Sequence, residues 1–513
     1  MRRPIDVDLD RRVKGARENG RPFAKRASRM AIGVLARARA FAVRSSVVIA
    51  LALTLAWAMA NKRRARARAH AHANANANAN ANAREEATED ARLATTRARA
   101  KSKTDGTKRD ERVGIGTVTV ILATNRASAE AKENWRAQAR TTYDGDVEFI
   151  FVVESAKSDA RDACVEVIVG EFGASGRTSA NGRSARVVEA GRATTSSQKI
   201  HNMLAGVRAM RTDSVWTLFL DDDVETRPGT IDCLARALAG DSDAFLVTGY
   251  PFDVPCSRDA KAPTTANLVT YMYATYHLVL IIAFSQGRVT KNVWGGCVML
   301  RADDLRRDAY GCVSAYANGG YSDDLILASI ADRENKRVLC PTTAVFPSYM
   351  PDAASFGAWW NYMRRQMFVL DTYADAHNRA LNHALLLAIV VTSCAFSTGL
   401  ALALYDIGAY VVRAEFASVA IDYTAVAAVT CFIFAMSSAR AMYFTLGRVC
   451  ESDGDYAVAS RAIARISWVK MTFAFAFAYA LVPVVAVLAL VSNRIVWGDA
   501  TYVKRRGAVR RVR

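Results

Sequence analysis

Short runs of apolar and β-branched residues recur through the first two thirds of the chain. These runs cover residues 117–124, 147–154, 185–189, 216–220 and 245–248. The stretches between them are polar or, as in 199–211, carry apolar residues at helical spacing. Buried strands that alternate with helices are typical of βαβ units and predict a mostly parallel sheet. We therefore expect one α/β domain over residues 113–350.

The N-terminal region predicts a tail, a membrane anchor and a linker. Residues 1–44 are rich in Arg and Ala, and residues 45–61 form an uncharged apolar run just long enough to cross a bilayer. The basic run 62–64 resists translocation and favours a signal anchor over a cleaved signal sequence. An organelle transit peptide is the alternative, which Asp6, Asp8 and Asp10 disfavour. Residues 62–112 contain a strict alternation of Ala with Arg, His or Asn, which indicates a low-complexity linker.

The C-terminal third is membrane-like. Residues 384–405 and 471–493 carry no charge and are strong candidate spans, whereas residues 423–439 form a weaker one. We expect two or three transmembrane helices within residues 384–493, followed by a basic tail, 494–513. With the catalytic domain in the cytosol, three spans would place that tail on the lumenal side, against the positive-inside rule.

The location of charge argues against a nucleic-acid partner. The 513-residue chain has a net charge of +19, yet residues 1–110 alone hold 26 of the 68 Lys and Arg and only 10 of the 49 Asp and Glu. The excess therefore lies next to the apolar runs, which is typical of membrane anchoring and not of a basic groove in a folded domain. The nine cysteines show no CxxC spacing and favour a reducing compartment. No feature of the sequence specifies an oligomeric state.

The clearest chemical signal is a run of three carboxylates, Asp221, Asp222 and Asp223, directly after an apolar strand. In an open parallel sheet, ligands bind at the carboxyl ends of the strands. Alternate residues of an extended chain project to the same side, so Asp221 and Asp223 can share one divalent cation, Mg²⁺ or Mn²⁺, beside a substrate diphosphate. A helix cap or a solvated acidic turn is the alternative.

Three further positions carry candidate binding or catalytic groups. Asp323 and Asp324 follow two glycines and precede an apolar helix, where a carboxylate either caps the helix or acts as a general base. Glu154 ends the second strand and could accept a hydrogen bond from a nucleobase or ribose, with a solvated loop as the alternative. Lys199 and Asn202 open a helix, on nearly one face, and the lysine could reach phosphate oxygens.

An aromatic and basic stretch, WWNYMRRQMF, precedes the first C-terminal span within residues 351–383. It predicts an amphipathic helix at the membrane surface, with arginines that snorkel or reach a phosphate.

Taken in order, these motifs resemble ceramide glucosyltransferases of the plant type. The matching stretches, which together cover about residues 117–373, are VEFIFVVES, SSQKIHN, FLDDDV, VTGYPFDVP, WGGCVML, ADDLRRDAYG, GGYSDDL and WNYMRRQMFVLDTY. The resemblance implies an α/β GT-A (Rossmann-like) catalytic domain with N-terminal and C-terminal transmembrane helices. It also implies inverting transfer of glucose from UDP-glucose to the primary hydroxyl of ceramide, at an ER or Golgi membrane, with the catalytic domain facing the cytosol.

The resemblance also assigns roles to carboxylates. Asp324 matches the catalytic base, Asp221 and Asp223 match the metal–diphosphate aspartates, and Asp159 matches the aspartate on the nucleotide side. Relatives usually carry Asp-Pro at that last position, whereas here alanine follows Asp159, so we expect Glu154 to share the role on the nucleotide side.

The remaining roles fall on a histidine and on the aromatic and basic stretch. His277 matches a histidine near the donor site, and Arg364, Arg365 and Gln366 stand where relatives carry (Q/R)xxRW, although the tryptophan is absent. The expected partners are therefore UDP-glucose, ceramide and the lipid bilayer. The alternatives are another membrane GT-A transferase acting on a lipid phosphate or a polysaccharide, an inactive membrane scaffold, and a nucleic-acid binder.

Overall fold

The computed structural model describes residues 30–69, 116–124, 127–178, 182–256, 266–285, 287–350, 353–413, 423–451 and 457–512. These residues belong to two compact units. Unit 1 lies within Met1–Thr54 and Val391–Ala435, and unit 2 lies within Leu55–Val390 and Met436–Arg513. Unit 2 contains the predicted α/β domain.

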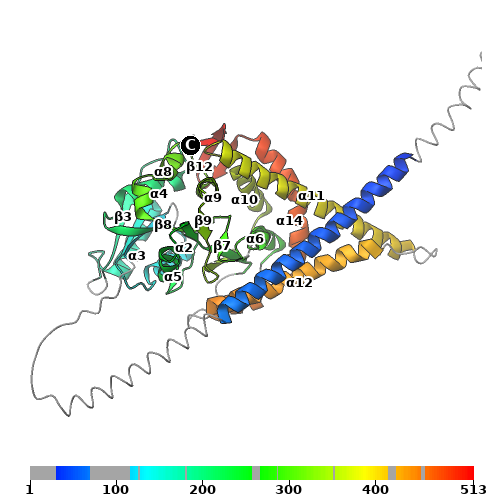
Figure 1. Ribbon diagram of the computed structural model, residues 1–513, viewed down its shortest axis with the longest axis horizontal. Coiled ribbons are helices and arrows are strands. Elements are labelled where there is room, and N and C mark those ends of the chain that lie inside the picture. Colours follow the sequence, from blue (N-terminus) through cyan, green and yellow to red (C-terminus); the bar gives the residue numbers. More distant parts are fainter. Residues whose placement is uncertain are drawn as a thin grey trace, which may run out of the picture. The chain divides into compact units, whose positions relative to one another are not determined.

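Eight strands among the described residues form the main sheet of unit 2, in the order β3-β2-β1-β4-β8-β5-β9-β7. Their bounds are β1 Thr117–Ala123, β2 Val147–Val153, β3 Arg183–Glu189, β4 Ser214–Leu220, β5 Ala244–Thr248, β7 Val289–Thr290, β8 Cys297–Arg301 and β9 Arg337–Leu339. Strands β3, β2, β1 and β4 are parallel, whereas β8 runs antiparallel to both β4 and β5. This topology confirms the predicted α/β, Rossmann-like class (Figure 1).

Helices cover both faces of the sheet because its strands are apolar on both sides. On β1, Val118, Val120 and Leu122 join one core cluster, while Ile121 joins the other. The helices of the first face are α2 Ala129–Ala139, α3 Asp159–Phe172 and α5 Thr230–Ala239. Those of the second face are α4 Gln198–Ala209, α7 Ala302–Arg306, α8 Cys312–Ala317 and α9 Asp323–Arg333.

A second, smaller layer lies beyond the main sheet in unit 2. Strand β6 (Tyr250–Val254) pairs in parallel with β10 (Val345–Tyr349). The helices α6 (Leu268–Leu280) and α10 (Phe356–Val369) both pack against the long apolar helix α14 (Trp468–Val491). Helix α10 coincides with the predicted amphipathic stretch.

The C-terminal segment is not a tail. It forms a three-stranded antiparallel sheet of β11 (Arg494–Trp497), β12 (Ala500–Arg505) and β13 (Ala508–Arg511), hereafter the C-terminal sheet. The β12–β13 turn consists of Arg506 and Gly507, whose φ angles of 51° and 81° are those of a tight hairpin. The prediction of a basic tail over 494–513 was wrong because charge was given more weight than the alternating strand pattern and this turn.

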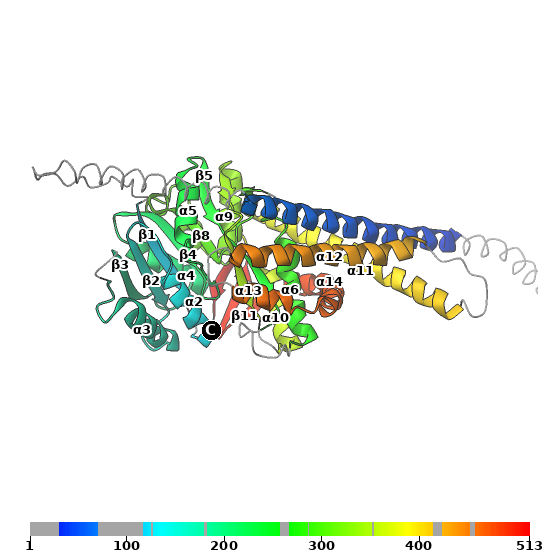
Figure 2. The same cartoon turned by 90° about the horizontal axis from the view of Figure 1, so that it is seen from below.

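In the part of the chain that the structure describes, four helices are long and apolar enough to cross a membrane: Met30–Ala69, α11 (Ala376–Arg413), α12 (Tyr423–Glu451) and α14. The first begins before residue 45 and continues past residue 61, so parts of the predicted tail and linker are helical (Figure 2). The remaining parts of those two predicted segments, 1–29 and 70–112, lie outside the described residues. A short helix, α13 (Ala457–Ala464), lies between α12 and α14.

Small residues hold the helices of unit 1 together. Val43, Ala403 and Ala428 share one apolar cluster, and a Cβ at Gly399 would come within 2.7 Å of the Ser46 Cβ. Small side chains at such positions let two membrane helices approach closely.

From Leu55 on, the N-terminal helix belongs to unit 2 and is anchored there. Trp57 Nε1 donates to Leu278 O at 2.9 Å, and the buried Arg64 donates to Ser285 Oγ at 2.9 Å and to Thr342 O at 2.8 Å. Because a buried arginine is stable only when it is paired, Arg64 fixes the end of this helix on the α/β domain.

Candidate active site

The site is built where β4 ends and α4 begins. Asp221, Asp222 and Asp223 follow β4, and Lys199 reaches them from the first turn of α4, which Ser197 caps. Lys199 Nζ lies 2.9 Å from Asp221 Oδ1 and 3.1 Å from Asp323 Oδ2. The lysine therefore links the acidic run after β4 to the acidic pair at α9.

The N-terminal end of α9 supplies the second acidic pair. Ser322 Oγ and the backbone N of Leu325 both donate to Asp324 Oδ1, the latter at 2.8 Å. These donors hold one oxygen of Asp324. Gly295 lies so close to the Asp323 carboxylate that a Cβ at this position would collide with it.

Helices α6 and α10 bring aromatic and basic side chains to the same region. His277 Nδ1 lies 2.7 Å from Asp253 Oδ2, and Tyr276 packs edge-on against Tyr362. Arg365 stacks over Trp497 with 4.6 Å between the guanidinium carbon and the ring centroid.

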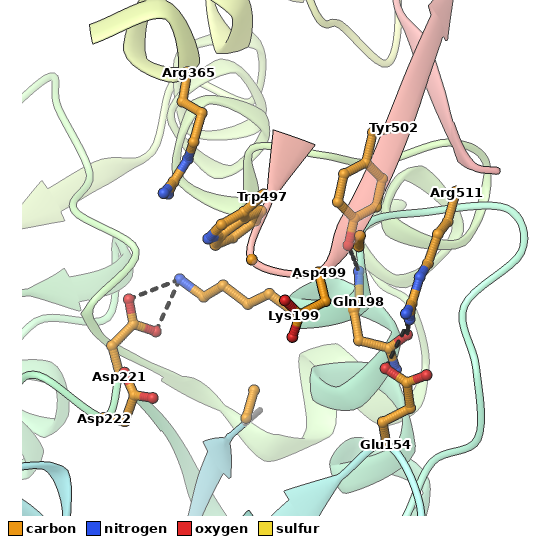
Figure 3. A pocket seen from close by; sticks show the side chains of 13 residues that line it. Glu154, Gln198, Lys199, Asp221, Asp222, Arg365, Trp497, Asp499, Tyr502 and Arg511 are labelled. Carbon is orange, nitrogen blue, oxygen red and sulfur yellow. Dashed lines mark hydrogen bonds and ion pairs between the residues drawn. The ribbon is translucent and has the colours of Figure 1, made fainter. Parts of the chain in front are cut away.

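Two adjoining cavities open between these groups. The larger has a volume of about 340 Å³ and the smaller about 160 Å³. Both are bordered by Lys199, Asp221, Arg365 and Trp497. The larger continues past Asp222 to Glu154 and the C-terminal sheet (Figure 3), whereas the smaller leads to Asp323, Asp324 and Gln366.

The structure does not bring every predicted residue to these cavities: Asp223, His277, Asp159, Asn202 and Arg364 border neither of them. Asp159 is an exposed residue in the first turn of α3, whereas Glu154 borders the larger cavity. Asn202 is buried below the cavity, where it donates to Val152 O at 3.1 Å and accepts from Gln198 at 2.9 Å. Arg364 bonds Ser492 at 3.4 Å, so of the two neighbouring arginines Arg365 is the one that borders the cavities.

Several residues that border the larger cavity were not expected from the sequence. They are Ala123 at the end of β1, Gln198, and six residues of the C-terminal sheet and its β11–β12 turn, namely Trp497, Gly498, Asp499, Ala500, Tyr502 and Arg511. Tyr321, from the glycine-rich stretch before α9, packs edge-on against both Trp497 and Tyr502. The hairpin signal at Arg506-Gly507 could have revealed this sheet, although not where it packs.

Burial, together with neighbouring carboxylates, governs the electrostatics of the site. Burial raises the pKa of Asp222 to about 7, with a further contribution from Asp223. Burial also raises the pKa of Asp324, and Asp323 adds to the effect. Burial alone would lower the pKa of Lys199, but the carboxylates of Asp221 and Asp323 outweigh it and raise that pKa. An extra cation would thus be favourable here.

The carboxylates of the site could hold a divalent metal ion only if a substrate supplied further ligands. Within the described residues, no group of three His, Cys, Asp or Glu side chains is arranged to hold an ion by itself. Mg²⁺ is usually bound by one or two carboxylates plus substrate phosphates. Asp221 and Asp223, which repel each other electrostatically, could supply such a pair.

Comparisons with solved structures find similarity to several glycosyltransferases. No protein-family model and no curated protein matches it. A mannosyltransferase from Pyrobaculum calidifontis, solved with GDP-Man and Mn²⁺, is similar over 77% of this chain and 97% of its own, at 16% identity and a TM-score of 0.36. TarS 1–349 of S. aureus is similar over 77% and 98%, at 10% identity and a TM-score of 0.29. Glucosyl-3-phosphoglycerate synthase of Mycobacterium tuberculosis is similar over 52% and 84%, at 13% identity and a TM-score of 0.28.

Proposed function

We propose that this chain is a membrane-bound glycosyltransferase that uses a nucleotide-sugar donor. The observation that carries the proposal is the convergence of Asp221, Asp323 and Lys199 at the carboxyl edge of a Rossmann-like sheet, beside a cavity of about 340 Å³. A lysine and a metal-binding carboxylate pair are the groups that a diphosphate requires. The cavity falls within the usual size range for small-molecule sites.

The donor and acceptor that we propose are UDP-glucose and ceramide. The motif resemblance supports this choice, and the four long apolar helices are consistent with a lipid acceptor. In the reaction, the primary hydroxyl oxygen of ceramide attacks the anomeric carbon, the bond from that carbon to the diphosphate breaks, and UDP leaves. A direct displacement of this kind inverts the anomeric carbon.

Asp324 is the proposed base. It borders the smaller cavity, beside the carboxylates and Lys199 at the proposed diphosphate position. It would take the proton of the attacking hydroxyl, so a single carboxylate suffices for one displacement. A bound Mg²⁺ or Mn²⁺ would offset charge on the departing diphosphate. Lys199 would add positive charge near the departing diphosphate. The pKa of His277 is raised because the neighbouring Asp253 carboxylate outweighs the opposing effect of burial, and this favours the protonated, positively charged ring.

The acceptor membrane is the one that α11 and α12 cross. Asn378 at the start of α11 donates to Leu325 O of α9 at 3.0 Å, and Tyr443 near the end of α12 donates to Asp253 O at 3.0 Å. Both ends of this helical hairpin therefore lie against the α/β domain, so the two helices cross the membrane outward and back.

Helix α14 does not carry the chain across the membrane again. Its start meets α6, through Ser467 N and Tyr271 OH at 2.9 Å, and its end meets α10, through Ser492 and Arg364. Its outer face exposes Phe473, Phe477 and other apolar side chains. We infer that α14 lies along the membrane surface and that the C-terminal sheet is on the same side as the active site.

This arrangement predicts the result of a topology experiment. A glycosylation acceptor inserted between α11 and α12 should be modified in microsomes, because that connection would be lumenal. An epitope placed after residue 513 should be digested by protease added outside intact microsomes. Protection of that epitope would show that α14 spans the membrane.

A substrate panel tests the proposed activity. Purified protein is incubated with UDP-glucose, UDP-galactose or GDP-mannose, each with ceramide or a polyprenyl phosphate, and the products are identified by mass spectrometry. We expect hexosylceramide from UDP-glucose. Transfer to the polyprenyl phosphate instead would favour the alternative transferase, and absence of every product would favour the scaffold.

A further inference from the structure

The C-terminal sheet contributes a charged side chain, Arg511, to the lining of the larger cavity. Arg511 Nη1 lies 2.7 Å from Glu154 Oε2 and 2.6 Å from Gln198 Oε1, and the arginine side chain is only 11% exposed. Glu154 directly follows β2, and Gln198 begins α4. Strand β13 is thus bonded, through Arg511, to the carboxyl end of β2 and to the start of α4.

The cross-strand partner of Arg511 contacts the same helix. Tyr502 pairs with Arg511 in the antiparallel register of β12 and β13, and its hydroxyl accepts from the backbone N of Gln198 at 3.1 Å. On one face of the C-terminal sheet, therefore, two neighbouring side chains meet the start of α4, directly before Lys199. The C-terminal sheet therefore packs on the start of α4 in one defined geometry. This packing depends on the largely buried charge of Arg511, which is stable only because Glu154 pairs with it.

The positions of these groups match the two ends of a nucleoside diphosphate. Lys199, Asp221 and Asp222 lie at one end of the cavity, and Glu154 and Arg511 lie at the other (Figure 3). If the diphosphate of the nucleotide lies against Lys199, its nucleobase extends toward Glu154 and Arg511. This step rests on the proposed function.

We propose that Arg511, held by Glu154, recognises the donor nucleobase, and that the C-terminal sheet forms the second wall of the nucleotide site. Uracil presents carbonyl acceptors beside an imide N–H. The planar guanidinium donates to carbonyl oxygens in a fixed geometry, and the Glu154 carboxylate accepts from the imide. Cytosine lacks that N–H and replaces one carbonyl by an amine, so this pair of residues selects a uridine nucleotide.

Direct nucleotide binding tests the proposal independently of glycosyl transfer. UDP and CDP are titrated by calorimetry into purified full-length wild type, Arg511→Ala, Arg511→Lys and Arg510→Ala. Arg510 is the matched control because it is the neighbouring arginine, is exposed and does not border the cavity. We expect wild type and Arg510→Ala to prefer UDP, and Arg511→Ala to bind UDP about tenfold to a hundredfold more weakly.

The lysine variant separates recognition from folding. Lysine keeps the positive charge beside Glu154 but lacks the planar fork, so Arg511→Lys should melt like wild type and lose preference for UDP over CDP. Unchanged UDP affinity and selectivity in both variants at position 511 would overturn the inference while leaving the proposed function intact. Absence of nucleotide binding by the wild type would instead contradict the proposed function itself.

Discussion

Replacing Asp324 by Asn should lower kcat by about 10²–10⁴-fold, which is the usual contribution of a general base. The amide has the shape of the carboxylate, and its oxygen can still accept from Ser322 and from the backbone N of Leu325. It cannot take the proton of the acceptor hydroxyl. UDP affinity and melting temperature should therefore stay close to those of the wild type, and the loss should appear in turnover.

The pH profile supplies an independent check on this base. Burial, with Asp323, raises the pKa of Asp324 above its ordinary value of about 3.9. Because the base must be ionised, kcat should fall as the pH drops through that raised pKa. The acidic limb should therefore lie at a higher pH than an exposed aspartate would give.

Asp332→Asn is the matched control, since Asp332 lies at the other end of α9, is partly exposed, and pairs with Lys291 and His377 away from the cavities. It should retain wild-type turnover. Equal losses in the two variants would show that the effect of Asp324→Asn is structural, and full activity of Asp324→Asn would remove the residue from the chemistry.

Removing divalent metal, or one of its proposed ligands, should have the second large effect. Metal-assisted stabilisation of a leaving diphosphate contributes several kcal/mol, or about 10³-fold in rate. Chelation with EDTA should abolish turnover, and Mn²⁺ or Mg²⁺ should restore it. Asp223→Asn should lower activity to a similar degree and weaken Mn²⁺ binding in the presence of UDP, as measured by electron paramagnetic resonance.

The control for this prediction is Asp213→Asn, an exposed carboxylate that pairs with Arg211 on the loop before β4. It should behave like the wild type in both measurements. If turnover persists in EDTA, Lys199 and Arg365 must neutralise the diphosphate without a metal, and Asp221 and Asp223 would then have another role.

Much of the fold can be read from local patterns. The runs that became β1, β2 and β4 are apolar on both faces, so their burial between two helical layers follows from composition alone. The acidic residues that end β4 are likewise informative because the carboxyl edge of a parallel sheet binds ligands. These patterns involve neighbours in sequence, which is why the sequence reveals them.

Long-range contacts explain what the sequence did not reveal. Arg511 and Glu154 are 357 positions apart, and no local signal pairs them. Arg364 and Arg365 are equivalent by type, and only the packing of α10 against α14 and β11 directs one of them to the cavities. Asp159 fits the motif order, but it lies in the first turn of α3, so that Glu154 takes the position at the cavity.

The central claim is best tested with membranes from a host that lacks its own ceramide glucosyltransferase. The membranes carry wild type or Asp324→Asn and receive radiolabelled UDP-glucose, ceramide and Mn²⁺. We predict labelled monoglucosylceramide, with the β configuration that inversion produces, from the wild type alone. Label in an α-linked product, or equal label from the variant, would contradict the account of a single inverting site with Asp324 as its base.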